Sequence, residues 1–222
     1  MTARLTDPLA GRVRGTVGAG RSLALAGGVL ALGGLLSPVV GLGAPAGAAS
    51  TSSLSKYLLT SNETPGYTVG GRPTTTSTAA GMIEGESLTK KESQSAVSTL
   101  QQAGFVKAVQ ESMKGSNANE GLSTVMQFSS PAGARAGAAL FLHLAKTGQA
   151  GWKPFTVAGV PGAKGVTVTG AEGGSANAYW SVGDCAFGSG IYNATALSAK
   201  AVASPVGIGI KSQAKRVGST CP

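Results

Sequence analysis

The chain has 222 residues, a formal net charge of +9 and a hydrophobic fraction of 42%, enough to bury a substantial core in one domain. The basic residues are scattered: no block of five occurs, and no aromatic residues are interleaved with them. This distribution argues against a nucleic-acid groove and indicates a solvated surface.

The first 48 residues have the layout of a secretory signal peptide. Four arginines precede an uncharged apolar segment, and small residues follow it up to Ala48. This order predicts export by the Sec route with cleavage near Ala48-Ala49. The alternative is an uncleaved anchor helix, because the uncharged run reaches the roughly 20 residues that a bilayer requires. In both cases the rest of the chain lies outside the cytosol, and we expect membrane contact only through this leader.

Removal of 48 of the 222 residues leaves 174, with 14 basic and 8 acidic side chains and a net charge of +6. We expect residues 49–66 to form a linker or short docking segment and residues 67–222 to form a single domain. Cys185 and Cys221 both remain, and an even pair of cysteines in an exported chain predicts a disulfide. A disulfide between them would close a loop that spans 36 residues, which should stabilise the fold by about 3–4 kcal/mol.

The first half of the mature chain carries several local signals in order. Leu54 to Leu59 predict one amphipathic turn, and Pro65-Gly66 predicts a turn after it. Residues 68–78 are β-prone but broken by glycine and proline, which suits an edge strand or an extended loop. Thr89 and Glu92 match a capping box at the start of a helix that ends near Gly104.

Two strands and a second helix are expected next. Residues 105–113 alternate as a strand, although apolar residues also repeat there every four positions, which leaves a second helical stretch open. Residues 122–129 read as a clearer strand. Ser130-Pro131 predicts a helix start, and the apolar face that follows predicts a helix ending at Gly148.

From Trp152 onward short apolar runs alternate with turns, which predicts an antiparallel meander with a two-residue hairpin at Gly183-Asp184. Ser204-Pro205 predicts the start of a terminal helix. The sequence therefore predicts an α+β fold: a mostly antiparallel sheet with two or three helices packed on one face, and a C-terminal helix tied by the disulfide.

Three segments resemble a group of secreted proteins and lipoproteins from high-GC Gram-positive (actinobacterial) bacteria: Y-L-L-T-S-N-E-T-P-G-Y at 57–67, Q-F-S-S-P-A-G-A-R-A at 127–136 and K-S-Q-A-K-R-V at 211–217. The resemblance implies a PsbP-like or extracellular-sensor-like α+β fold and an extracytoplasmic location, and it implies no activity. This chain departs from the sensor-like members, which commonly carry more cysteines, and from the lipoproteins, which carry an acylated cysteine.

Few residues point to catalysis. His143 is the one histidine, so a metal site lacks a second imidazole and we expect no metal and no cofactor. Glu84 and Glu86 alternate as strand neighbours, which would put both carboxylates on one side. Paired carboxylates can perform acid/base chemistry on sugars, but spacing alone does not establish the separation required, and a solvated loop is the favoured alternative. Gly188-Ser189-Gly190 lacks the further residues of a phosphate loop and is interpreted as strand irregularity.

Four aromatic residues are candidate ligand contacts: Trp152, Tyr179, Trp180 and Tyr192. Alternation sends Tyr179 and Trp180 to opposite faces of a strand, so that one can be buried and the other can stack on a sugar or peptide; core packing is the favoured alternative. We expect a monomeric, secreted, non-enzymatic binding or sensor-like domain for a small molecule, a peptide or a cell-wall component. The alternatives are an envelope protein held by positive charge to anionic polymers, and a hydrolase that uses Glu84 and Glu86.

Overall fold

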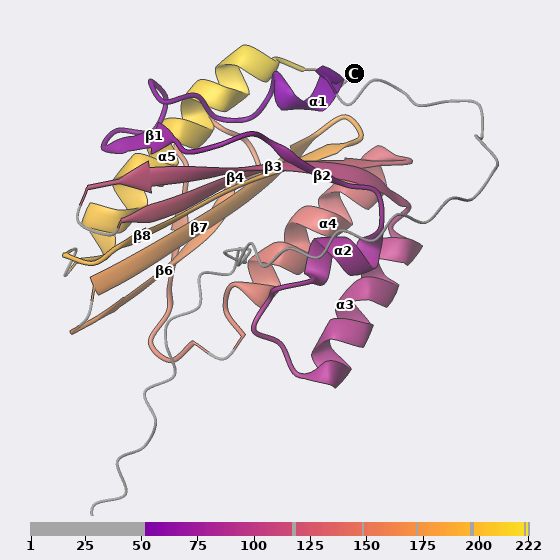
Figure 1. Cartoon of the computed structure of the whole chain (residues 1–222), viewed down its shortest axis with the longest axis horizontal. Helices are drawn as coiled ribbons and strands as arrows, with labels where there is room; N and C mark the ends of the chain where they lie inside the picture. Colours follow the sequence, from indigo (N-terminus) through magenta and orange to yellow (C-terminus); the bar gives the residue numbers. More distant parts are fainter. Residues whose placement is uncertain are drawn as a thin grey trace, which may run out of the picture.

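The computed structural model describes residues 52–116, 119–147, 149–171, 173–195, 198–219 and 221, so the predicted leader and its cleavage site lie outside the described residues. Within these ranges eight strands form one antiparallel sheet in the order β1-β3-β4-β8-β7-β6-β5, and β2 also pairs with β3 (Figure 1). No helix in the described ranges is both long and apolar enough to cross a bilayer. The α+β architecture is as predicted.

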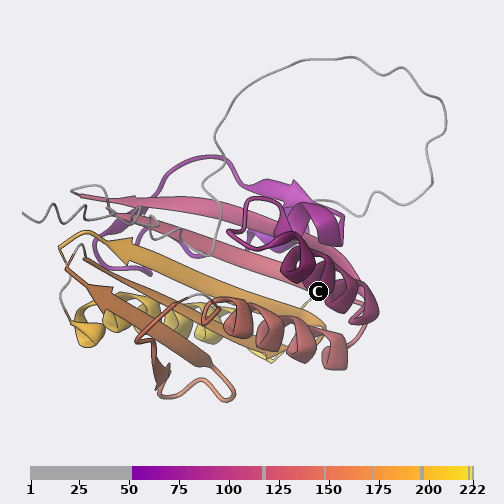
Figure 2. The ribbon, with the colours of Figure 1, turned by 90° about the horizontal axis from the view of Figure 1, so that it is seen from below.

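The strands are β1 (Tyr67–Val69), β2 (Thr74–Thr76), β3 (Phe105–Gly115), β4 (Glu120–Phe128), β5 (Lys153–Thr156), β6 (Lys164–Gly170), β7 (Gly173–Val182) and β8 (Cys185–Asn193). The helices are α1 (Ser52–Ser55), α2 (Ala79–Ile83), α3 (Lys90–Gln102), α4 (Pro131–Leu144) and α5 (Ala199–Val217). Figure 2 shows the long strands β3 and β4 (pink) running beside the later strands (orange).

Local sequence signals account for most of these boundaries. The Thr89 hydroxyl accepts a hydrogen bond from the Glu92 amide at 3.3 Å, and the Glu92 carboxylate accepts one from the Thr89 amide at 2.8 Å, which completes the predicted capping box. Gly104 follows α3 with a φ of +74°, a conformation that glycine adopts without steric cost. The Ser130 hydroxyl caps α4 by accepting from the Gly133 amide at 3.1 Å.

The edge of the sheet also follows the prediction. Strands β1 and β2 pair with successive parts of the outer edge of β3, and the segment between them contains Gly70, Gly71 and Pro73. Proline cannot donate to a ladder and is confined to such edges. The ambiguous residues 105–113 lie in strand β3 and not in a helix.

The predicted start of the terminal helix at Ser204-Pro205 is wrong. Helix α5 begins at Ala199, where the Ser198 hydroxyl accepts from the Ala201 amide at 3.3 Å, and Pro205 lies inside the helix. An interior proline removes one backbone hydrogen bond. Burial of Val202 on the same stripe as Val206 and Ile210 favours the longer helix despite that loss. The predicted helix end at Gly148 lies outside the described residues, and α4 itself ends at Leu144.

Helices cover both faces of the sheet. On the face that carries Met126, Phe128 and Tyr179, here called the α4 face, the helices α2, α3 and α4 pack. On the face that carries Phe187 and Trp180, here called the α5 face, helix α5 packs (Figure 1). Two predicted helices, α3 and α4, thus share one face, where the short helix α2, which was not predicted, joins them. The C-terminal helix lies on the opposite face, whereas the prediction placed the helices on one face.

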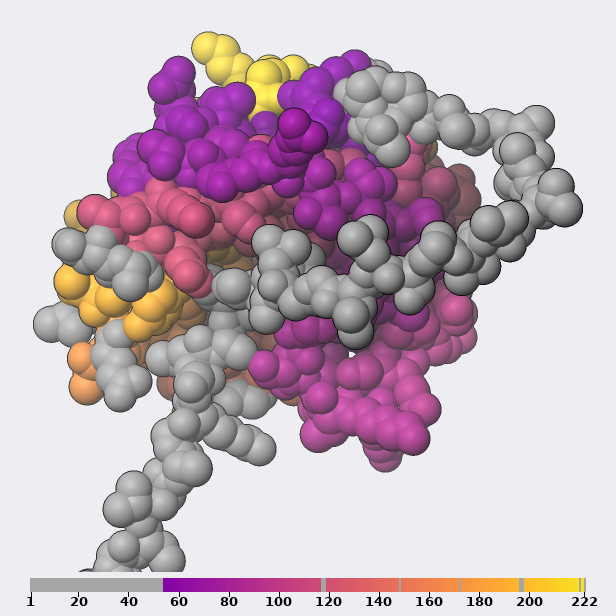
Figure 3. Space-filling view, in the orientation of Figure 1, coloured from indigo at the N-terminus to yellow at the C-terminus, as the bar shows by residue number. Residues whose placement is uncertain are grey.

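The segment that precedes β1 docks against the α5 face. Leu54, Leu58 and Leu59 are buried there, and the space-filling view shows violet residues of the early part of the chain packed against the pink residues that follow them in sequence (Figure 3). Helix α5 holds it in place, because the Arg216 guanidinium donates to the Leu58 carbonyl and to the Glu63 carboxylate, both at 2.8 Å. The N-terminal segment is therefore part of the folded body.

The predicted disulfide joins Cys185 at the start of β8 to Cys221 beyond α5, with the two Cα atoms 5.7 Å apart, a spacing typical of disulfides. Gly183 lies in the β7–β8 turn with a φ of +55°, and its backbone lies against Cys221. The bond ties the end of the chain to the hairpin.

Candidate functional site

Three cavities meet beside the loop that follows α2. The first, here called the chamber, has a volume of about 20 Å³ and is lined by residues that include Glu86, Thr124, Phe141, Asn177 and Tyr179. The second, the channel, has about 200 Å³ and is lined by Thr74, Thr76, Gly81, Met82, Glu84, Glu86 and Gln110. The third, the groove between α2 and α3, has about 440 Å³ and is lined by residues that include Ile83, Glu84, Glu86, Val97 and Gln101. Glu86 lines all three.

The loop after α2 separates the two candidate glutamates. Glu84 is the exposed residue that ends α2, Gly85 turns the chain with a φ of +87°, and Glu86 is partly buried. The expectation that Glu84 and Glu86 are strand neighbours on one side is therefore wrong, since residues 84–86 lie in no strand. Both still line the channel and the groove, and Glu86 alone reaches the chamber.

The environment of Glu86 disfavours its charged form. Burial raises the pKa of the Glu86 carboxyl to about 7. The linings of the three cavities include no lysine, arginine, histidine or aspartate among the described residues. Glu86 is thus a carboxylic acid beside the sheet whose pKa lies near 7. No cationic side chain among the described residues lines the cavities to stabilise its carboxylate.

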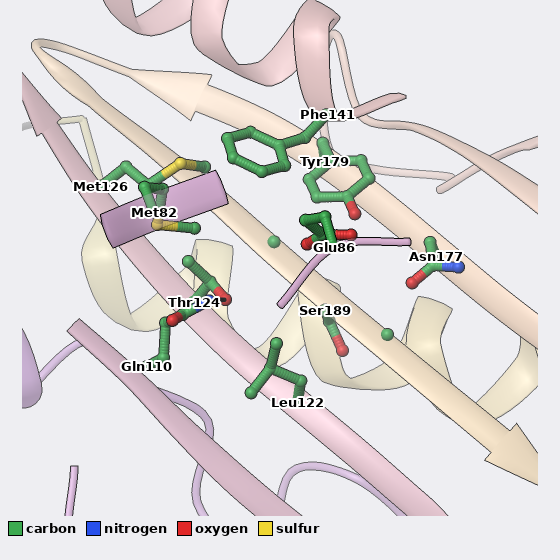
Figure 4. A pocket seen from close by; sticks show the side chains of 12 residues that line it. Met82, Glu86, Gln110, Leu122, Thr124, Met126, Phe141, Asn177, Tyr179 and Ser189 are labelled. Carbon is green, nitrogen blue, oxygen red and sulfur yellow. Dashed lines mark hydrogen bonds between the residues drawn. The ribbon is translucent and has the colours of Figure 1, made fainter. Parts of the chain in front are cut away.

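Tyr179 of β7 lies next to Glu86 in the chamber. Its side chain is 8% exposed, and its ring packs against the ring of Phe141 with 6.0 Å between the centroids. Figure 4 shows the Tyr179 hydroxyl directed toward the Glu86 carboxylate. Burial, and then the charge of Glu86, raise the pKa of the Tyr179 hydroxyl, which therefore stays protonated.

Asn177 adds an amide to the same chamber. It is 6% exposed, and its polar atoms, like the Tyr179 hydroxyl, are not among the buried side-chain atoms that lack a partner in the described part of the chain. Both side chains line the chamber. A small molecule in the chamber can therefore hydrogen-bond to the Asn177 amide and the Tyr179 hydroxyl.

Glycines of β8 make room for these two side chains. A Cβ atom at Gly188 would lie 2.8 Å from a ring carbon of Tyr179, and one at Gly190 would lie 2.3 Å from Oδ1 of Asn177. The stretch Gly188-Ser189-Gly190, which the sequence suggested was a strand irregularity, runs in regular register between β4 and β7. Its glycines form the floor of the chamber.

The structure does not bring the four candidate aromatic residues together. Tyr179 and Trp180 lie on opposite faces, as alternation predicts, and both are buried. Trp180 stacks on Phe187 with 4.5 Å between centroids on the α5 face. Trp152 is 39% exposed and lies under the Lys146 ammonium. Tyr192 is half-buried near the end of β8. Of the four, Tyr179 alone lines the chamber.

A further cavity lies on the α5 face. It has a volume of about 510 Å³ and is lined by residues that include Val160, Pro161, Trp180, Lys211 and Lys215. Both lysines are exposed on α5. The border of this cavity is therefore positively charged, whereas the cavities at Glu86 are bordered by carboxylates.

Other candidates have a structural explanation. His143 is exposed on α4. Asp184, Cys185 and Cys221 lie within 4.8 Å of one another, but both sulfur atoms belong to the disulfide and offer no thiolate to a metal.

The sequence analysis named Glu86 and Tyr179 as separate candidates, and it missed Asn177 and Gln110. The glycines at 188 and 190 were a usable signal, because glycines in a strand interior often mark the close approach of a neighbouring group.

No protein-family model matches the chain, and no curated protein matches it. Among solved structures, the extracellular domain of PknH from Mycobacterium tuberculosis is similar with a TM-score of 0.49 and 17% sequence identity, over 75% of this chain and 97% of that chain.

Proposed function

We propose that this protein is an exported, non-enzymatic binding domain whose ligand enters the channel and reaches the chamber at Glu86. The observation that carries the proposal is the convergence of three polar side chains, those of Glu86, Asn177 and Tyr179, on one cavity. Ligand sites are mostly apolar cavities with a few convergent polar groups. Met82, Phe141 and Met126 supply the apolar part of this lining.

Export is part of the proposal. It is supported by the leader-like composition of residues 1–48 and by the disulfide, a bond that persists in oxidising compartments. The sensor-like role suggested by the sequence would require that ligand binding be transmitted to a partner.

Blocking the channel tests the proposal. Thr76 lines the channel and Thr75 does not, because neighbouring strand residues point to opposite faces. Thr76→Trp therefore fills the channel, whereas Thr75→Trp is a matched control on the other face of the same edge strand. The exported protein is incubated with a small-molecule extract of the cells that produce it, and the retained mass is measured by native mass spectrometry. We expect retention by the wild type and Thr75→Trp and loss in Thr76→Trp; equal retention by both variants, or none by the wild type, would contradict the proposal.

A second candidate is attachment to anionic envelope polymers through the cavity bordered by Lys211 and Lys215. The net charge of the mature chain and the position of both lysines at a cavity support it. Its test is release from the wall fraction by salt: release that is indifferent to ionic strength between about 0.05 and 0.5 M would contradict an electrostatic attachment.

A further inference from the structure

A single small polar group would nearly fill the chamber. Its volume of about 20 Å³ matches about one water molecule. The wider channel shares Met82, Glu86 and Gln110 with it. A ligand that uses both spaces therefore places a small head group in the chamber and a longer body in the channel.

The polar groups of the chamber favour a donor with positive charge. The Glu86 carboxylate, the Asn177 amide oxygen and the Tyr179 hydroxyl oxygen can each accept a hydrogen bond. A primary ammonium group has three N–H donors and is close to water in size. A carboxylate or phosphate would instead meet Glu86 without a cation to offset the repulsion.

Aromatic surface supports the same choice. The rings of Phe141 and Tyr179 both line the chamber, and the face of an aromatic ring attracts a cation. The charged and titratable groups that border the three cavities are Glu84, Glu86 and Tyr179. The basic residues of the flanking segments, Arg72, Lys90 and Lys91, do not line them.

We propose that the ligand of the chamber and channel carries a primary amine, whose ammonium group enters the chamber and pairs with the Glu86 carboxylate while the Asn177 amide oxygen and the Tyr179 hydroxyl oxygen accept hydrogen bonds from its remaining N–H groups. This inference rests on the proposed function and specifies the ligand class. The body of the ligand lies in the channel between β2 and α2, where Thr74, Thr76 and Gln110 offer hydrogen bonds.

The test uses three probes of known chemistry: n-butylamine, 1-butanol and tetramethylammonium. The amine and the alcohol have the same chain length, and the quaternary cation has charge but no N–H and is too large for the chamber. Binding to the ¹⁵N-labelled exported protein is followed by NMR at the Asn177 side-chain amide and the Gly188 and Gly190 backbone amides. At pH 8 the amine is protonated and Glu86 is largely ionised.

We expect n-butylamine to shift these signals saturably at pH 8, with 1-butanol and tetramethylammonium at least about tenfold weaker. Glu86→Gln keeps the shape of the side chain and removes its charge, and it should weaken binding of n-butylamine about tenfold. Glu120→Gln removes an exposed carboxylate that lines none of the three cavities and should leave amine binding unchanged. At pH 5.5, where Glu86 is protonated, wild-type binding should fall to the level of Glu86→Gln.

The outcomes separate the two proposals. Equal binding of butanol and butylamine, or unchanged amine binding in Glu86→Gln, would overturn the amine proposal, as would an absence of amine binding at these signals. After any of these results, the proposed function still holds if the wild type retains a small molecule from the extract and Thr76→Trp does not. If Thr76→Trp retains it as well, both the proposed function and the amine proposal are wrong.

Discussion

Oδ1 of Asn177 occupies the space that a side chain at Gly190 would need, since a Cβ atom there would lie 2.3 Å from it. The two residues are neighbours across the β7–β8 ladder, where Asn177 pairs with Gly190. The missing side chain allows the amide to lie on the sheet and to reach the chamber. The shape of the site thus depends on one glycine as much as on the polar groups.

Gly190→Ala should displace the Asn177 amide from the chamber and weaken ligand binding. The amide is the end of a flexible side chain and can rotate away, so we expect a loss of stability of about 1 kcal/mol or less. Binding of n-butylamine should weaken several-fold, as expected when one hydrogen bond is lost. NMR titration measures the binding and urea unfolding measures the stability. Unchanged binding would show that Asn177 does not contact the ligand.

Glu86→Gln should change the dependence of stability on pH. Folding raises the pKa of Glu86 from 4.5 to about 7, so its contribution to stability is full below pH 4.5 and is lost as the pH rises through 7. The wild type should therefore lose on the order of 2 kcal/mol, relative to Glu86→Gln, between pH 5 and pH 8, a value reduced for partial solvent access. Urea unfolding of both proteins across this range measures the difference, and parallel curves would show that Glu86 is solvated.

Alanine substitutions at two helix glycines should change the stability of the fold in opposite directions. A Cβ at Gly137 of α4 would lie 2.2 Å from the ring of the buried Phe128, so Gly137→Ala should destabilise the fold by about 1–3 kcal/mol. Gly207 of α5 has no atom within 4 Å of an added Cβ, and Gly207→Ala should stabilise the fold by about 0.5–1 kcal/mol through helix propensity. Thermal unfolding compares them; stabilisation by both substitutions would show that α4 does not lie close to the sheet at Gly137.

Removing the disulfide should be costly. The double substitution Cys185→Ala, Cys221→Ala opens a loop that spans 36 residues, and the free energy of unfolding should fall by about 3–4 kcal/mol. Reduction of the wild type should give a matching loss in urea unfolding. Two free thiols in correctly exported protein, or an unchanged unfolding midpoint, would contradict the structural role of this bond.

The fold was predictable where the signal was local. The Thr89 capping box, Ser130 before Pro131, and Gly183-Asp184 each fix a boundary through neighbouring backbone groups. Ser204-Pro205 has the same local form as Ser130-Pro131 but lies inside a helix. Burial of Val202 decides that boundary, and burial depends on how α5 lies across the sheet.

The candidate site was less predictable because it depends on sheet order. Glu86 follows α2, Gln110 lies on β3, Asn177 on β7 and Gly190 on β8. The sequence contains no local pattern that joins them, and only the order β3-β4-β8-β7, with α2 packed on its α4 face, brings them together. Spacing suggested a pairing of Glu84 with Glu86, and the turn at Gly85 prevents it.

Titration of the Glu86 carboxyl, followed by ¹³C NMR in the exported protein with and without n-butylamine, tests the proposed amine site most directly. We expect a pKa near 7 in the free protein and a lower pKa with the amine, because the ammonium stabilises the carboxylate. A free pKa at the ordinary 4.5, unmoved by the amine, would contradict it.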